Sequence, residues 1–231
     1  MNLTPRLELA ARMLCGFENI ADIGCDHGLL SAHLVQNGAK RAIACDLRPG
    51  PLAKAGETAR RLGLESRIET RLCDGLNGVA PGEVQAVAIC GMGGELIARI
   101  IGRAGWAAQG GHLFVMQPQS KGRELRRFLW ENDFEIVQEA LAAEGRRLYS
   151  VISARGLGGA NASQSAEKNM FLFSDKLRED PLFWAFLDMQ KKKYRRIAAG
   201  RAMGPGGAGE AAEVLAMLET TENRLDVQEG I

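Results

Sequence analysis

The stretch Ala21-Asp22-Ile23-Gly24-Cys25-Asp26-His27-Gly28 decides the fold of this chain. The apolar run that ends at Ile23 predicts a buried strand, and the apolar positions after Gly28 predict a helix to about Gln36. A glycine turn between a strand and a helix lets the backbone approach a ligand closely and directs helix N-terminal amides at it. The spacing of this turn, acidic-x-Gly-x-x-x-Gly, differs from the Gly-x-Gly-x-x-Gly pattern of nicotinamide dinucleotide sites.

Short apolar runs alternate with longer segments of helical periodicity from Ile20 onward, which predicts an α/β protein with a parallel sheet and crossover helices. The predicted strands are Ile20 to Ile23, Arg41 to Cys45, Arg67 to Cys73, Val84 to Cys90, His112 to Met116, Phe134 to Ala140 and Arg147 to Ala154. Helices are predicted from Thr4 as N-cap, after Gly28, over Pro51 to Leu62, over Gly94 to Arg103 and over Arg123 to Glu131. No helical segment separates the last two strands. We therefore expect a hairpin at Glu144 and Gly145 and a seventh strand that inserts antiparallel.

The composition and the apolar pattern of the sequence change after Arg155, and we place a domain boundary between residues 1–154 and 155–231. Gly156 to Ser165 is rich in small residues and is predicted to be a linker. A helix from Asp180 as N-cap, a turn within Gly204 to Gly209 and a second helix to about Leu225 predict a C-terminal helical hairpin.

The two helices of this hairpin differ in charge, so pairing would bring opposite signs together. The first is basic, with Lys191, Lys192, Lys193, Arg195, Arg196 and Arg201, and the second is acidic, with Glu210, Glu213, Glu219, Glu222, Asp226 and Glu229. The sequence leaves open whether the basic run is a solvated face or faces RNA. In the second case, binding weakens steeply with salt.

The composition is that of a soluble α/β protein, because 46% of the 231 residues are hydrophobic, 25% are charged and 28 residues are glycine. No apolar run is long enough to span a membrane, and residues 1–14 do not form a signal peptide, so we expect a cytoplasmic protein. The five cysteines form no CxxC pair, and we expect buried free thiols and no metal site. The net charge of +1 gives no global case for nucleic-acid binding. The sequence does not fix the oligomeric state, and a monomer is our expectation.

Acidic residues follow two further predicted strands. Asp46 stands at the carboxyl end of the second strand, where its side chain can accept hydrogen bonds from both hydroxyls of a ribose, and Leu47 follows it. Asp74, followed by Gly75, comes after the third strand and is placed to receive an adenine amino group. Ligands in open α/β sheets bind outside these strand ends, so the loop from Asp22 and the two acids predict one adenosyl site.

Two segments after the fourth and fifth strands are candidates for a substrate pocket. Gly91-Met92-Gly93-Gly94 exposes backbone groups that a planar base can approach, although a plain strand-to-helix turn would look the same. Gln117-Pro118-Gln119 offers two primary amides, each both a donor and an acceptor.

These motifs resemble those of the bacterial TrmK-type tRNA adenine-N1 methyltransferases. The resemblance rests on Ala-Asp-Ile-Gly-x-Asp-His at Ala21 to His27, Cys-Gly-Met-Gly-Gly at Cys90 to Gly94 and Gln-Pro at Gln117 to Pro118, and it spans residues 1 to 154. It implies a Rossmann-like class I methyltransferase fold, S-adenosylmethionine as methyl donor, and N1 of adenine 22 in tRNA as acceptor. The loop is similar to the acidic-x-Gly-x-Gly-x-Gly loop of that class, with Asp26 in place of the middle glycine. The more glycine- and alanine-rich linker and the acidic second helix of the C-terminal hairpin depart from the family.

The expected roles follow from these positions. The cofactor site is expected to comprise Asp22, Gly24, Cys25, Gly28, Asp46, Leu47, Asp74, Gly75 and Gly91, and the substrate site Met92, Gly93, Gly94, Gln117, Pro118 and Gln119. Asp26 is the first candidate for a catalytic group, because a carboxylate near the exocyclic amino group orients the base and stabilises positive charge. Asp26 can equally bind the ammonium group of the cofactor. His27 is the second candidate, and it can instead cap the following helix.

Three other functions compete with this interpretation. A methyltransferase acting on a small molecule or a protein would share the donor site, but the chain has no insertion forming a lid. A nicotinamide-dependent oxidoreductase would need the glycine spacing that is missing here. A non-catalytic RNA-binding module would have no use for the intact Asp22, Gly24 and Asp46.

Overall fold

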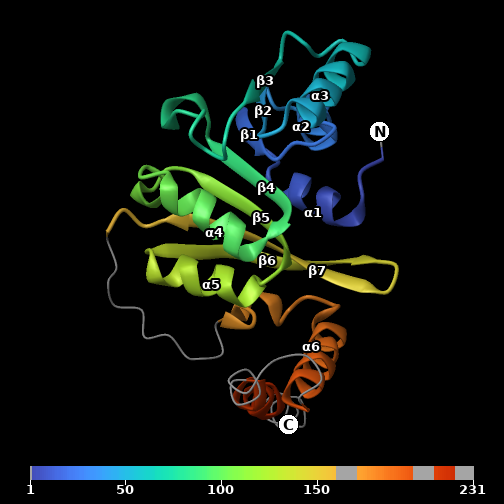
Figure 1. Cartoon of the computed structure of the whole chain (residues 1–231), viewed down its shortest axis with the longest axis vertical. Coiled ribbons are helices and arrows are strands. Elements are labelled where there is room, and N and C mark those ends of the chain that lie inside the picture. Colours follow the sequence, from blue (N-terminus) through green and yellow to red (C-terminus); the bar gives the residue numbers. More distant parts are fainter. Residues whose placement is uncertain (1, 160–170, 200–210, 222–231) are drawn as a thin grey trace. The chain divides into compact units, whose positions relative to one another are not determined.

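Seven strands form one sheet in the computed structural model, which describes residues 2–159, 171–199 and 211–221 (Figure 1). In the order β3-β2-β1-β4-β5-β7-β6, they are β3 (Ile68–Leu72), β2 (Arg41–Asp46), β1 (Asn19–Ile23), β4 (Ala86–Gly93), β5 (Leu113–Ser120), β7 (Arg147–Gly156) and β6 (Phe134–Glu144). The first five are parallel, and β7 runs antiparallel to both of its neighbours. The strand order reverses between β1 and β4, and a ligand cleft forms at the carboxyl ends of the strands at such a point.

Helices cover both faces of the sheet. They are α1 (Pro5–Met13), α2 (Leu29–Gln36), α3 (Pro49–Arg61), α4 (Gly94–Arg103) and α5 (Gly122–Glu131), with short 3-10 turns at Pro81–Glu83, Ala107–Gln109 and Asp175–Leu177. The first helix begins after Thr4, as its N-cap and the following proline predict.

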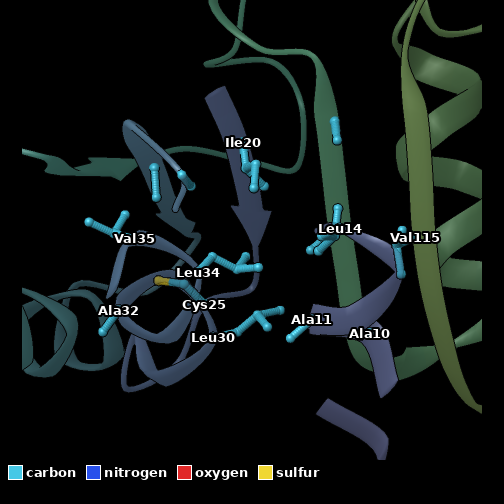
Figure 2. Close-up of a cluster of buried hydrophobic side chains, with 14 of the residues drawn as sticks. Ala10, Ala11, Leu14, Ile20, Cys25, Leu30, Ala32, Leu34, Val35 and Val115 are labelled. Carbon is cyan, nitrogen blue, oxygen red and sulfur yellow. The ribbon is translucent and has the colours of Figure 1, made fainter. Parts of the chain in front are cut away.

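Alternate residues of each strand build two separate cores, because successive side chains of a strand point to opposite faces. Ile20 of β1 packs with residues of α1, α2 and α3, as Figure 2 shows for Leu14, Leu30 and Val35. Ile23 of the same strand packs on the other face with residues of α4 and α5. The polar carboxyl ends of the strands lie between these two cores.

The strands β4 and β5 are longer than the sequence predicts. Val84 to Cys90 and His112 to Met116 were the expected strands, with Gly91 and Gln117 each placed just beyond a strand end. In the structure β4 continues to Gly93 and pairs with β5 as far as Ser120, with register shifts around Met92. A bulge of this kind accepts the left-handed backbone of Gly91, whose φ is 81°. The expectation that the fourth strand ends at Cys90 was therefore wrong.

The predicted antiparallel hairpin is confirmed. It joins β6 to β7, pairs Glu144 with Arg147 and turns at Gly145, whose φ is 58°. Both strands extend beyond the predicted bounds, so Gly156 belongs to β7 and not to a linker.

The described residues divide into two compact units, one of residues 2–159 and 171–177 and one of 178–199 and 211–221. In the second unit, α6 (Phe183–Ala198) has Leu182 as its N-cap, so the prediction of Asp180 at this position was wrong by two residues. Asp180 Oδ1 still accepts a hydrogen bond, from the Leu182 amide at 2.8 Å. Residues 211–221 are helical. Arg195 of α6 pairs with Glu219 at 3.1 Å, so the two helices meet through the expected opposite charges.

Several expectations for the C-terminal part lie outside the described residues. These are the linker beyond residue 159, the turn within Gly204 to Gly209, and Arg201, Glu210, Glu222, Leu225, Asp226 and Glu229. The domain boundary after residue 154 stays a prediction. Among the described residues, no helix is long and apolar enough to cross a membrane.

Candidate active site

A cavity of about 520 Å³ lies where the first four strands end, and its volume falls in the range that holds a small-molecule ligand. It brings together twelve of the residues selected from the sequence: Asp22, Gly24, Cys25, Asp26, His27, Asp46, Leu47, Asp74, Gly75, Gly91, Met92 and Gln119. Five selected residues do not line it: Gly28, Gly93, Gly94, Gln117 and Pro118.

Hydrogen bonds hold the loop between β1 and α2 against the neighbouring strand β2. The amides of Gly24 and Cys25 both donate to the carbonyl oxygen of Cys45, at 2.8 and 2.9 Å. Gly24 has a φ of 74°, and the side-chain Cε of Met92 lies 2.1 Å from the point where a Cβ would stand. Asp26 has a φ of 48°, a left-handed conformation that Asp tolerates better than most residues. Asp26 can therefore occupy a position where related loops have glycine.

Asp22 is the most deeply buried acid of the cavity lining, at 4% exposure. The Ser31 hydroxyl donates to its Oδ2 at 2.7 Å. Burial raises the pKa of Asp22 to about 6, and the hydrogen bonds from Ser31 oppose this rise. At neutral pH the side chain is thus a carboxylate that is poorly solvated, and a cation bound nearby would stabilise it.

Asp46 is also buried, at 7% exposure, and backbone amides orient it. Arg48 N donates to Oδ1 at 2.9 Å, and Asp26 N lies 3.4 Å from Oδ2. The carboxylate is thereby fixed at the end of β2. Leu47 beside it is 65% exposed, so an apolar surface faces the cavity next to a fixed hydrogen-bond acceptor.

Asp74 is held from α4. Arg103 Nη1 donates to its Oδ2 at 3.2 Å, and both side chains are about half exposed. Gly75 has a φ of 61°, and Ile100 of α4 lies 3.0 Å from the position of an added Cβ. The glycine therefore lets α4 close against this end of the cavity.

The glycines after Met92 serve helix packing. The carbonyl oxygen of Lys121 lies 2.2 Å from where a Cβ of Gly94 would stand, and Ser120 Oγ lies 3.4 Å from that of Gly93. These glycines allow α4 to begin against the start of α5. Gly28 has a similar role, since a Cβ there would stand 2.9 Å from Ala55 of α3.

Gln117 acts inside the fold. It is 0% exposed, its Oε1 accepts a hydrogen bond from Gly91 N at 3.2 Å, and its Nε2 donates to the Pro118 carbonyl at 3.1 Å. Both polar atoms of this side-chain amide are thus engaged, and the bond from Gly91 holds the bulge of β4. Gln119, two residues further along β5, is exposed and lines the cavity.

The two catalytic candidates lie side by side at the cavity wall. The side chain of Asp26 is 67% exposed and that of His27 48%, and their Oδ1 and Nε2 atoms are 3.8 Å apart. At this distance they do not share a hydrogen bond. Both side chains are exposed enough to contact a molecule bound in the cavity.

Sequence reasoning missed ten residues of the lining: Arg6, Leu7, Ile23, Leu29, Leu30, Arg48, Cys73, Cys90, Leu96 and Ile100. Most are apolar, and periodicity alone assigns such residues to a core. Arg6 is different, because it comes from α1 before the first strand and no local motif connects it to the site.

The cysteines contribute to the same region. Cys25, Cys73 and Cys90 line the cavity, and all five cysteines are free. Only Cys25 and Cys45 are buried as expected, whereas Cys15 is exposed and Cys73 and Cys90 are partly buried. Within the described residues, no group of three His, Cys, Asp or Glu side chains could hold a metal ion.

The sheet order, the antiparallel β7 and the acids at the ends of three successive strands define a Rossmann-like methyltransferase of class I. Residues 3–152 match the protein family described as "Methyltransferase domain", and the chain belongs to this family.

One similar sequence and two similar solved structures narrow the comparison. The tRNA (adenine(22)-N(1))-methyltransferase of Bacillus subtilis is 32% identical over 155 residues, which are 67% of this chain and 65% of that protein. The crystal structure of the B. subtilis m1A22 tRNA methyltransferase TrmK has a TM-score of 0.81 at 25% identity and covers 95% of this chain and 98% of that one. Streptococcus pneumoniae Sp1610 in complex with S-adenosyl-L-methionine has a TM-score of 0.77 at 27% identity, over 93% of this chain and 100% of that one. The resemblance seen in the sequence motifs is thus confirmed.

Proposed function

We propose that this chain transfers the methyl group of S-adenosylmethionine to N1 of an adenine in tRNA, at adenine 22, in the cytoplasm. The observation that carries the proposal is the cavity in which Asp22, Asp46 and Asp74 stand at the ends of three neighbouring strands. The names of the similar proteins support tRNA as the substrate and adenine 22 as the position.

The residues around the cavity suit this cofactor. The buried Asp46 carboxylate is oriented by two amides and can accept both ribose hydroxyls, and the exposed face of Leu47 can pack on the adenine ring. Asp74 can accept from the adenine amino group. The poorly solvated Asp22 is suited to the cationic end of the same molecule.

The bound cofactor supplies an electrophilic methyl group on a sulfonium. The task of the chain is then to hold the adenine in line with that methyl group and to exclude water. The exposed Asp26 carboxylate is placed to accept a hydrogen bond from the exocyclic amino group, whose acidity rises as N1 becomes alkylated. Gln119 offers a further donor and acceptor for the base edge.

The test is transfer of tritiated methyl from S-adenosylmethionine to unmodified bacterial tRNA, followed by separation of the nucleosides. We expect label in 1-methyladenosine, and no label in a transcript that carries guanine at position 22. Asp46→Ala should lose cofactor binding, whereas Glu65→Ala, an exposed acid outside the cavity, should behave as the wild type.

Each negative result has its own meaning. If calorimetry shows cofactor binding but tRNA carries no label, S-adenosylmethionine stands as the donor and tRNA is rejected as the acceptor. Label in tRNA at another nucleoside would reject N1 of adenine.

A further inference from the structure

A second cavity lies on the solvent side of α3, and we call it the α3 cavity. Its volume is about 710 Å³, and it is lined by His27, Lys54, Glu57, Thr58, Arg60 and Arg61. Ala55 and Ala59 of the same helix are buried in the core that α3 shares with α2 and the sheet (Figure 1). The other side of the helix is exposed, and it carries Lys54 and Arg61 two helical turns apart on one face.

The cations of the α3 cavity have no partner within the chain. Among the described residues, no ion pair or side-chain hydrogen bond is made by Lys54, Arg60 or Arg61. Glu57 precedes the two arginines by three and four positions, the spacings at which ion pairs form on a helix, and still pairs with neither of them. The three cations are therefore available to an anion from outside the chain.

Stabilisation of the helix does not explain the whole cluster. Arg60 and Arg61 lie in the last turn of α3, where cations interact favourably with the helix dipole. Lys54 lies in the first half of the helix, where this interaction is lost. The α3 cavity has three cations and one carboxylate, in a chain whose 29 basic and 28 acidic residues nearly balance. Such a local excess of positive charge suits an anion that carries several charges.

The α3 cavity adjoins the candidate active site. His27 lines both cavities, so the loop after β1 forms the border between them. This loop packs directly on α3, because a Cβ at Gly28 would stand 2.9 Å from the Cβ of Ala55. A long molecule with one group in the active-site cavity can therefore continue past His27 onto the cations of α3.

An RNA strand has the chemistry that fits this arrangement. An enzyme that acts on a base takes the base out of the stack, and the phosphates on either side of it stay at the protein surface. Contacts from Lys and Arg to such phosphates fix the register of the nucleic acid. We propose that Lys54, Arg60 and Arg61 bind backbone phosphates next to the target adenine. This inference rests on the proposed function, because it takes the acceptor to be a nucleotide of tRNA.

The experiment measures binding of fluorescently labelled, unmodified tRNA to the full chain by anisotropy, between about 50 and 200 mM salt. The test variant combines Lys54→Ala with Arg61→Ala. We expect it to weaken tRNA binding at the lowest salt by at least roughly tenfold. The slope of log affinity against log salt should also become shallower, by about 0.7–0.9 for each lost phosphate contact.

The control variant removes the same charge from the other end of the sheet. It combines Arg12→Ala with Arg155→Ala, two exposed arginines outside both cavities. Arg155 is paired with Leu113 at the start of β5, whereas the active-site cavity lies at the carboxyl ends of the parallel strands. We expect the control variant to bind tRNA within about twofold of the wild type, because phosphate contacts are local.

Two further measurements separate phosphate binding from a role in folding. Cofactor affinity by calorimetry should stay within about twofold in both variants, since the changed side chains lie outside the active-site cavity. Ethylation of single phosphates, which removes their charge, should weaken binding by the wild type at phosphates next to adenine 22. This interference should disappear with the test variant and persist with the control variant.

An unchanged salt slope in the test variant would overturn the inference, and so would the same pattern of phosphate interference in the variant and the wild type. Loss of cofactor affinity in the test variant would also overturn it and assign these cations to the structure of the loop. A wild-type chain that binds tRNA through the α3 cavity and transfers no methyl group would reject the proposed function alone. A wild-type chain that binds no tRNA would reject both.

Discussion

Asp22 is an acid whose ionised form is destabilised by burial, and it is also a candidate ligand for the cationic end of the cofactor. Its pKa of about 6 lies above its ordinary value of 3.8, chiefly because of burial. The folded state therefore binds this proton more tightly than the unfolded chain does. The stabilisation of the fold by the bound proton is complete below about pH 4 and is lost as the pH rises through about 6. At neutral pH the buried, ionised side chain lowers the free energy of unfolding, and a cation bound beside it would offset this destabilisation.

Asp22→Asn should consequently stabilise the apoprotein at pH 7.5 by about 2 kcal/mol, and much less at pH 4.5. Urea unfolding at the two pH values measures the difference. The same variant should bind the cofactor more weakly, since the cationic end loses a carboxylate. Glu8→Gln, which removes an exposed acid of α1, is the control. A stability gain that does not grow with pH would contradict the assignment to Asp22.

One variant can separate the two candidate roles of Asp26, which are catalysis and binding of the cofactor. Its left-handed backbone tolerates Asn, so Asp26→Asn removes the charge without straining the loop. We expect kcat for tRNA methylation to fall by at least roughly a hundredfold, while cofactor affinity stays within a few fold. Calorimetry beside single-turnover kinetics measures both. Loss of cofactor affinity with Asp26→Asn would instead support binding of the cofactor ammonium group.

At the scale of elements, a buried ion pair joins α5 to the β6–β7 hairpin. The side chains of Arg126 and Glu139 are 3% and 0% exposed and are hydrogen-bonded to each other. Arg126 Nη2 also donates to Ser150 Oγ at 3.2 Å, and Ser174 N donates to Glu139 Oε2 at 2.9 Å. One cluster thus connects a helix, two strands and the segment after residue 170.

Arg126→Met should destabilise the protein by about 3–5 kcal/mol, because it leaves Glu139 charged, buried and without its partner. Arg126→Met combined with Glu139→Leu should recover much of this loss, although Ser174 N then lacks an acceptor. Chemical unfolding of the two single variants and the double variant gives the coupling energy. A single variant as stable as the wild type would show that water reaches the cluster.

The helices and strands were largely predictable because each shows a local periodicity. The start of α1 after Thr4, the helix from Gly94 and the antiparallel hairpin all follow from caps, apolar spacing and the absence of a helical segment. The continuation of β4 through Gly91 was not predictable. It depends on pairing with β5 and on Gln117 from that strand, and a local run of glycines carries no sign of either.

The site was predictable to the extent that it follows the strand ends. Asp22, Asp46 and Asp74 lie together because parallel strands place their carboxyl ends at one edge of the sheet. The role of Gly94 was not visible, since the helix that it packs against begins almost thirty residues later at Gly122. Arg6 was missed for the same reason, because its partners lie 138 residues away at Glu144 and beyond.

At the scale of the whole molecule, every residue of the cavity lining and both cores belong to the first compact unit. The second unit carries basic residues on α6, of which Lys192, Lys193, Arg195 and Arg196 are exposed. Lys191 is 7% exposed, so it does not extend this basic surface. Because the net charge of the chain is only +1, RNA binding has to rest on such local groups.

A chain that ends after residue 177 should therefore bind the cofactor within about twofold of the full chain, and should methylate tRNA with a much lower kcat/KM. The kcat/KM of the full chain should also fall more steeply with salt, because contacts between basic side chains and phosphates release counterions. Calorimetry and initial rates between 50 and 200 mM salt, the span over which such contacts weaken by roughly a thousandfold or more when many are made, measure both effects. Loss of cofactor binding on truncation would mean that the first unit does not fold alone. Equal rates with the same salt dependence would remove the second unit from tRNA recognition and leave the first unit to contact the whole substrate.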